Sequence, residues 1–82
     1  MRARKRGKIE RAFGRALREA REKAVISQEA LALESGYHPT YISMLERGLY
    51  SPSVRTIFSL AKVLKISPAV LMERAYKISG GS

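Results

Sequence analysis

Four side chains near the middle of this 82-residue chain share one side of a short predicted helix, and three of them can form hydrogen bonds with another molecule. These side chains are Thr40, Ser43, Met44 and Arg47. At about 100° per residue they lie opposite Ile42 and Leu45. Hydroxyl and guanidinium groups form hydrogen bonds with base edges and phosphates. An ordinary amphipathic helix with a solvated back gives the same pattern, so this helix alone leaves both interpretations open.

The flanking residues place this helix in a pair joined by a tight turn. Ser27 can cap the start of a first helix, which then runs on without a breaker. Gly36 follows where a helix ends in a left-handed residue, a conformation that glycine adopts without steric cost. Pro39 is pre-set for the first position of the second helix, and Gly48 ends that helix. Helix, short turn and helix over residues 26–48 predict a DNA-reading helix-turn-helix.

The motif residues also keep a recognisable mutual spacing. They are Ser27-Gln28-Glu29, Leu31-Ala32, Gly36, Tyr41-Ile42-Ser43, Leu45-Glu46-Arg47-Gly48 and Pro52-Ser53. In this spacing the chain resembles the Cro/C1-type (Xre family) helix-turn-helix regulators, which include the controller proteins of restriction–modification systems. The resemblance covers roughly residues 13–72. It implies an all-α, five-helix, lambda-repressor-like domain that binds operator DNA as a two-fold homodimer, with residues 39–47 as the recognition helix in the major groove.

The resemblance also implies which side chains face double-stranded DNA. Thr40, Ser43, Met44 and Arg47 are expected to read bases, because Pro39 stands where the family often has a polar reader and has no side-chain donor. A second set is expected along the sugar-phosphate backbone. Its members are Gln28, His38, Pro39, Tyr41, Tyr50, Ser51 and Arg55. For Tyr50 a plain connector with a buried ring is the open alternative, and for His38 a merely solvated ring.

Arg21 and Glu46 are the two charges expected to point inward. Arg21 borders the apolar stripe of the first predicted helix, and Glu46 lies on the inner side of the recognition helix. Two inward charges are costly unless they meet. In the resembled family the residues at these positions pair, so we expect a structural ion pair. The alternative is that both side chains snorkel to water.

The two ends of the chain divide it into an arm, a domain and a tail. Residues 1–8 carry five basic side chains and no acid, which predicts a disordered arm that either follows DNA or adds nonspecific attraction. The domain is expected over residues 9–78, because an apolar stripe begins near Ile9. Residues 79–82 are expected to form a flexible tail.

The last predicted helix, over about residues 68–76, carries more apolar surface than one terminal helix of so small a domain can hide. It either completes the core or forms a dimer surface. The candidate dimer contacts are Val70, Leu71, Tyr76 and Ile78.

Composition narrows the function classes further. The net charge is +9 and the isoelectric point about 10.5, which favours a polyanionic partner. The absence of cysteine and the single histidine exclude a disulfide framework and a Cys- or His-cluster metal site. We therefore expect no cofactor, no metal and no evident small-molecule ligand. No stretch approaches the roughly 18 apolar residues of a membrane span, so a cytoplasmic, nucleoid-associated protein of a prokaryote or phage is the simplest expectation.

Rival functions find less support in the residues. The sequence shows no catalytic triad, no paired carboxylates and no phosphate-cradling glycine loop that an enzyme could use. The sequence also lacks the interleaved aromatic residues that form a stacking platform for RNA bases. An antitoxin-type module, which neutralises a protein partner and binds DNA secondarily, remains the alternative. The polar outer side of residues 40–47 favours a DNA groove over such a partner.

Overall fold

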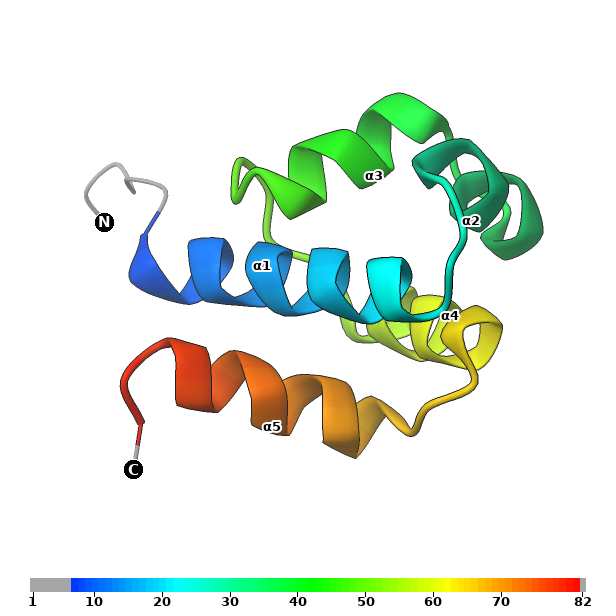
Figure 1. Ribbon diagram of the computed structural model, residues 1–82. Helices are drawn as coiled ribbons and strands as arrows, with labels where there is room; N and C mark the ends of the chain where they lie inside the picture. The colour runs from blue at the N-terminus through cyan, green and yellow to red at the C-terminus, as the bar shows by residue number, and fades with distance from the viewer. Residues whose placement is uncertain (1–6, 82) are drawn as a thin grey trace.

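The computed structural model describes residues 7–81, which form five α-helices and no strand. The helices are α1 (Lys8–Lys23), α2 (Gln28–Ser35), α3 (Pro39–Glu46), α4 (Val54–Leu64) and α5 (Pro68–Ile78), as Figure 1 shows. The predicted all-α, five-helix architecture is confirmed. The predicted basic arm falls largely on residues 1–6, which lie outside the described residues.

Helix boundaries differ from the predicted ones by one or two residues. Helix α1 begins at Lys8, one residue before the predicted start, because the Glu10 carboxylate accepts a hydrogen bond from the Gly7 amide at 3.0 Å and closes the first turn. Helix α3 ends at Glu46, which leaves Arg47 as its C-cap. Helix α5 runs on to Ile78.

Serine hydroxyls begin three of the helices. Ser27, Ser53 and Ser67 each precede a helix, and each Oγ accepts a hydrogen bond of 3.0–3.1 Å from the amide three residues on. Each bond satisfies one of the first-turn amides that a helix leaves unpaired, a contribution of about 1 kcal/mol. Gly36 ends α2 with φ +83°. The caps that were evident in the sequence therefore fix where the motif helices start and stop.

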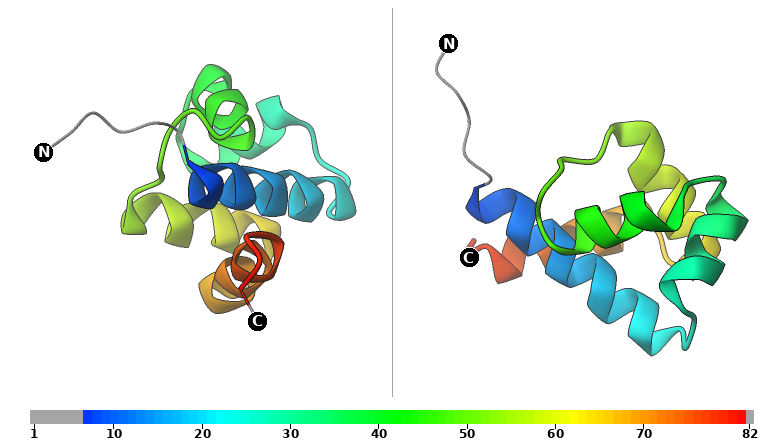
Figure 2. Two further views of the ribbon diagram at one scale, coloured as in Figure 1. Left: turned by 90° about the vertical axis from the view of Figure 1, so that its left-hand side faces the viewer. Right: turned by 90° about the horizontal axis from the view of Figure 1, so that it is seen from above.

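Helix α1 is the centre of the fold. Helices α3 and α5 lie on opposite sides of α1 (Figures 1 and 2). Helices α2 and α4 lie together at the end of the structure that is away from the start of α1 and the end of α5 (Figure 1). Every helix contributes at least one side chain that is fully removed from water. The largest of these are Leu17, Leu31, Ile42, Leu45, Leu60 and Leu71. Burial of such a side chain contributes about 1.5–3 kcal/mol, so this shared core is what holds α3 on the outer surface.

The predicted dimer contacts on α5 do not lie on one surface. Leu71 has no exposed area and belongs to the core, so its assignment to a dimer surface is wrong. Leu71, Ala75 and Ile78 follow at steps of four and three residues, which turns all three toward the rest of the domain. Val70 is 38% exposed and Tyr76 is 56% exposed.

Helix α4 carries apolar side chains on two sides. Val54 is 70% exposed and Phe58 is 60% exposed. The buried side of α4 carries Leu60 and Leu64, one turn apart, and Phe58 lies about 160° around the helix from Leu60. The apolar residues of this helix are thus divided between a buried side and an exposed side.

Residues 79–81, which belong to the predicted flexible tail, close the end of α5. The amides of Ser79 and Gly81 donate to the carbonyl oxygens of Ala75 and Tyr76 at 2.9 and 3.0 Å. Gly80 has φ +95°, the left-handed conformation that ends a helix in this way. A β-carbon at Gly81 would collide with the Tyr76 ring, so the backbone of residue 81 lies directly on that ring.

Within residues 7–81, none of the helices has both the length and the apolar character that crossing a bilayer requires.

Candidate nucleic-acid interface

Helix α3 presents one apolar side to the core and one polar side to solvent. Ile42 and Leu45 are fully buried on the inner side. The four predicted base readers remain accessible on the outer side: Thr40 and Arg47 are exposed, Ser43 and Met44 half-buried. Because α3 forms one outer layer of the fold (Figure 1), this row of side chains can approach another molecule without rearrangement of the core.

An imidazole caps the start of α3, which sequence analysis missed. His38 precedes Pro39, and its Nδ1 accepts a hydrogen bond of 3.1 Å from the Thr40 amide. Nδ1 is then the unprotonated nitrogen, so the neutral ring carries its proton on Nε2. The sequence showed a histidine where Ser, Thr or Asp usually caps the helix, and the ring supplies the acceptor in their place. The exposed imidazole can use its Nε2–H as an outward donor.

The end of α3 is tied to α1 by a two-point ion pair. Arg21 Nε and Nη2 donate to Glu46 Oε2 and Oε1 at 2.6 and 3.0 Å. The side chain of Glu46 is 3% exposed and that of Arg21 is 12% exposed. The pKa of Arg21 is raised, first of all by its hydrogen bonds to Glu46, against the opposing effect of burial. The two inward charges meet, and neither snorkels to water.

Gln28 and a backbone carbonyl complete this network. Arg21 Nη1 donates to the carbonyl oxygen of Ile26 at 2.9 Å, and Gln28 Nε2 donates to Glu46 Oε1 at 2.9 Å. The network therefore joins α1, the α1–α2 turn, the first residue of α2 and the last residue of α3. Gln28 was predicted to lie along the DNA backbone. In the structure its amide nitrogen holds the recognition helix in place.

A cluster of hydroxyl groups joins the start of α3 to the start of α4. Thr56 is 3% exposed, and its Oγ1 lies 3.1 Å from Tyr37 Oη, 3.4 Å from Tyr41 Oη and 2.9 Å from Ser53 Oγ. A hydroxyl has one hydrogen and two lone pairs, which matches three neighbours of this kind. No role for Tyr37 or Thr56 was predicted from the sequence. Thr56 could have been noticed because it stands three residues after the serine that caps α4.

The loop after α3 brings further polar groups beside this cluster. Tyr50 is 46% exposed, and its ring centroid lies 6.3 Å from that of Tyr41. The plain-connector alternative required a buried ring, and Tyr50 is not buried. Ser51 and Arg55 are exposed in the loop and in the first turn of α4. The structure thus brings Tyr41, Tyr50, Ser51 and Arg55 to the region where α3 and α4 begin.

Two glycines seat the end of α3 closely on α1. A β-carbon at Gly14 would lie 2.6 Å from the carbonyl oxygen of Glu46 and closer still to that of Leu45. Gly48 has φ +75°, and a β-carbon there would lie 2.7 Å from Arg11 Cγ. Sequence analysis gave Gly14 no role. The available signal was a glycine inside a helix, where it costs about 0.5–1 kcal/mol relative to alanine and so needs a packing reason.

Residues 7–81 bring no three His, Cys, Asp or Glu side chains together in a group that could hold a metal ion. The chemistry that this part of the chain offers is hydrogen bonding and positive charge on the outer side of a rigidly held helix.

Comparison with known proteins agrees with this geometry. The helix-turn-helix family HTH_3 matches residues 17–71. The control protein C.BamHI of Bacillus amyloliquefaciens is 40% identical over 62 residues, which cover 74% of this chain and 76% of that protein. An uncharacterised HTH-type transcriptional regulator of Mycobacterium tuberculosis is 42% identical over 62 residues, or 76% of this chain. The chain spans 44% of the length of that mycobacterial relative.

Solved structures extend the likeness to the whole fold. The clp gene regulator ClgR of Corynebacterium glutamicum superposes with a TM-score of 0.85 at 30% identity, over 88% of this chain and 77% of that one. The restriction-modification controller protein C.AhdI of Aeromonas hydrophila superposes with a TM-score of 0.73 at 41% identity, over 74% of this chain and 92% of that one. Restriction–modification controller proteins are among its relatives. The chain therefore belongs to the helix-turn-helix family of Cro/C1-type DNA-binding transcriptional regulators, which are non-enzymatic proteins.

Proposed function

We propose that this regulator binds an inverted-repeat operator as a homodimer, with one α3 helix in the major groove of each half-site. The observation that carries the proposal is the outer side of α3, where polar side chains stand accessible on a helix whose two ends are held by hydrogen bonds. The major groove of B-DNA is about 12 Å wide and admits an α-helix. A bacterial cytoplasm is the proposed site of action, since the relatives named above are bacterial regulators.

The proposed contacts divide into two classes. Thr40, Ser43, Met44 and Arg47 face base edges. The sugar-phosphate backbone is contacted by groups around the starts of α2, α3 and α4. These are Gln28, His38, Pro39, Tyr41, Tyr50, Ser51 and Arg55. The outward Nε2–H of His38 and the exposed guanidinium of Arg55 are suited to phosphate oxygens, whereas Pro39 and Tyr41 offer packing against the sugar edge.

The base-reading assignment is tested by alanine substitution on the outer side of α3. Thr40→Ala and Ser43→Ala should each relax the preference among operator variants by about 1–3 kcal/mol, because a lost base contact removes discrimination at that base pair. Competition binding against single-base operator variants measures the effect. Leu33→Ala, at a side chain of α2 that is 82% exposed, is the control and should leave the preference unchanged. Identical site preferences for wild type and both α3 variants would refute the assignment. A uniform loss in Arg47→Ala would assign that guanidinium to a phosphate.

The layered fold restricts where the two-fold contact can lie. Helices α3 and α5 are on opposite sides of α1 (Figure 2), so a contact through the outermost face of α5 would point the two recognition helices in opposite directions. Both helices must enter successive major grooves on one side of the DNA. Seen from the α3 side, α4 lies at an edge of the molecule (Figure 2, right). A contact at this edge leaves both α3 helices facing the same way.

Apolar side chains occupy that edge, two of them exposed and two half-buried. We call this surface the α4 patch; it consists of Val54, Phe58, Ile66 and Pro68. Phe58, Ile66 and Pro68 line one shallow hollow. Val70 and Tyr76, the exposed members of the predicted contact set, belong to α5, the helix that begins at Pro68. An exposed apolar surface of this kind suits a self-complementary interface.

The dimer is tested by a charge in the α4 patch. Phe58→Asp should shift the protein from dimer to monomer in sedimentation, because a carboxylate would have to be buried without a partner. Since the Phe58 side chain is exposed, the fold should survive. Leu33→Asp places the same charge on another exposed site and should still dimerise. A folded Phe58→Asp variant that dimerises as the wild type does would place the interface elsewhere.

A further inference from the structure

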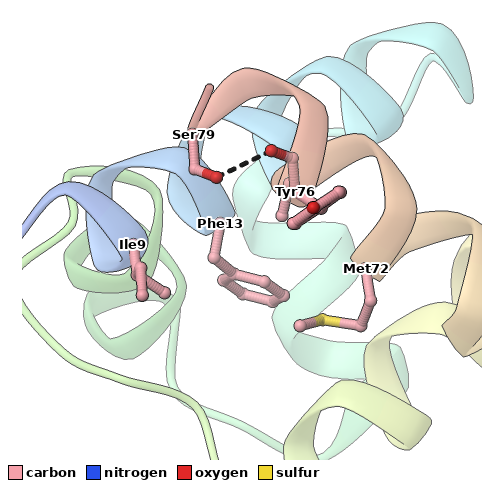
Figure 3. Close-up of a pocket in the computed structure, with 6 residues that line it drawn as sticks. Ile9, Phe13, Met72, Tyr76 and Ser79 are labelled. Carbon is pink, nitrogen blue, oxygen red and sulfur yellow. Dashed lines mark hydrogen bonds between the residues drawn. The ribbon is translucent and has the colours of Figure 1, made fainter. Parts of the chain in front are cut away.

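The start of α1 and the end of α5 enclose an apolar pocket that the DNA-binding proposal does not use. Its volume is about 150 Å³. Figure 3 shows side chains from both helices around this space: Ile9 and Phe13 from α1, Met72 and Tyr76 from α5. Ala75 and Ser79 complete the lining. The sequence gave no sign of a ligand site because these residues come from opposite ends of the domain.

The lining is mainly apolar, and its side-chain polar groups are the hydroxyls of Tyr76 and Ser79. Ser79 Oγ donates to the carbonyl oxygen of Tyr76 at 2.6 Å, a bond drawn in Figure 3. The remaining walls are aliphatic, aromatic and thioether surfaces. A dry apolar cavity of about 150 Å³ accommodates a benzene-sized molecule. The part of a ligand that enters this pocket is therefore apolar and no larger than one aromatic ring.

A positive charge stands beside the mouth of the pocket. Lys8 precedes Ile9, and its Nζ lies 4.0 Å from the position that a β-carbon on Gly80 would occupy. This places the ammonium at the C-terminal end of α5, next to the lining residue Ser79. The nearby carboxylates have other partners, since Glu10 accepts from the Gly7 amide and Glu73 pairs with Lys77 at 3.6 Å. The mouth thus complements a negative group.

We propose that this pocket binds a small amphipathic anion: a molecule with one aromatic ring or an apolar body of similar size, and a carboxylate that reaches Lys8. The pocket is too small to be a protein interface by itself, because stable interfaces bury about 1,200–2,000 Å² in total. Binding at this pocket does not depend on the proposed dimer.

The probe for this proposal is 3-phenylpropionate, followed through the methyl NMR signals of Ile9 and Met72 in the full chain. We expect saturable shifts of both signals. Phenethylamine, which has a similar apolar body and the opposite charge, should bind about tenfold more weakly, because Lys8 attracts the anion and repels the cation. Lys8→Gln should remove this difference between the two probes while the apolar part still binds.

A negative charge introduced at the entrance gives a second, independent test. Ile9 is 70% exposed, so Ile9→Asp should fold and should abolish detectable binding of the anion, whereas Leu33→Asp should leave it unchanged. The absence of saturable shifts at Ile9 and Met72 with either probe would overturn the proposal. NMR shifts that change with protein concentration but not with either probe would also overturn the proposal, because a second copy of the chain would then cover the pocket. Equal affinity of both probes in the wild type would reject the role of Lys8.

Discussion

Glu46→Ala is expected to lower the free energy of unfolding by about 3–5 kcal/mol, because it leaves the guanidinium of Arg21 largely buried without its counter-charge. The loss also removes the acceptor of the Gln28 amide and releases the end of α3 from α1. Urea denaturation of wild type and variant measures the change. Domains of this kind are stable by about 5–15 kcal/mol in total, so the variant should be close to unfolding.

A double-mutant cycle separates the contribution of the Arg21–Glu46 contact to stability from the other effects of each substitution. Arg21→Met combined with Glu46→Leu should recover much of the loss, since apolar residues of similar volume can replace a buried ion pair at little cost. The exposed pair Arg18 and Glu22, joined at 3.0 Å on the surface of α1, is the matched control. Replacing both members of that pair should change stability by about 0.5 kcal/mol or less. Strictly additive losses for Arg21 and Glu46 would show that their contact does not stabilise the fold.

The contribution of Arg21 should not vary with pH near neutrality. Its pKa in the folded chain is raised by Glu46 above an ordinary value that is already far above neutral. A group with a raised folded pKa stabilises the fold fully below its unfolded pKa and loses that contribution only as pH rises through the folded value. Across roughly pH 5–9 the guanidinium is charged in both states, so Arg21 itself adds no slope to the stability profile.

Gly14→Ala is the second substitution with a large expected effect, and here two opposing effects must be compared. Alanine favours a helix interior by about 0.5–1 kcal/mol over glycine. The added methyl group would nevertheless lie within 2.6 Å of the Glu46 carbonyl oxygen, and overpacking costs about 1–3 kcal/mol or more. Because the obstacle is backbone and cannot rotate away, we expect the clash to dominate, with a net loss of about 2 kcal/mol in urea denaturation.

An alanine elsewhere on the same helix isolates the clash. Arg18→Ala changes an exposed position of α1 and should leave stability within about 0.5 kcal/mol of the wild type. If Gly14→Ala is as stable as the wild type or more stable, α1 and α3 do not approach each other as closely as described. If it is destabilised, operator affinity should fall as well, because the methyl group pushes the recognition helix away from α1.

Local signals in the sequence were sufficient to predict the motif. Ser27 caps α2, Gly36 ends it in the left-handed conformation, and Pro39 begins α3. These features act within one helical turn, so they can be interpreted without the rest of the chain. The two-sided pattern of α3 was equally local, and Ile42 is fully buried as its position predicted.

Most of the features that were missed depend on how helices meet. Leu71 and Phe58 are both apolar residues on amphipathic helices, and only the packing of α4 and α5 decides that the first is buried and the second exposed. The His38 cap required knowledge that the imidazole folds back onto the Thr40 amide. Gly14 has its role because a distant carbonyl approaches it. Apart from the local His38 cap, these relations join residues that lie far apart in the chain, so they cannot be seen within one helical period of the sequence.

The most direct test of the DNA-binding model is selection of binding sites from random double-stranded DNA, followed by the stoichiometry of the complex on the selected site. We predict an inverted repeat whose half-site centres lie about 34 Å apart, one helical turn, occupied by two copies of the chain. Thr40→Ala and Ser43→Ala should relax single positions within each half-site. Enrichment of an asymmetric site bound by one copy, or no enrichment at all, would contradict the model.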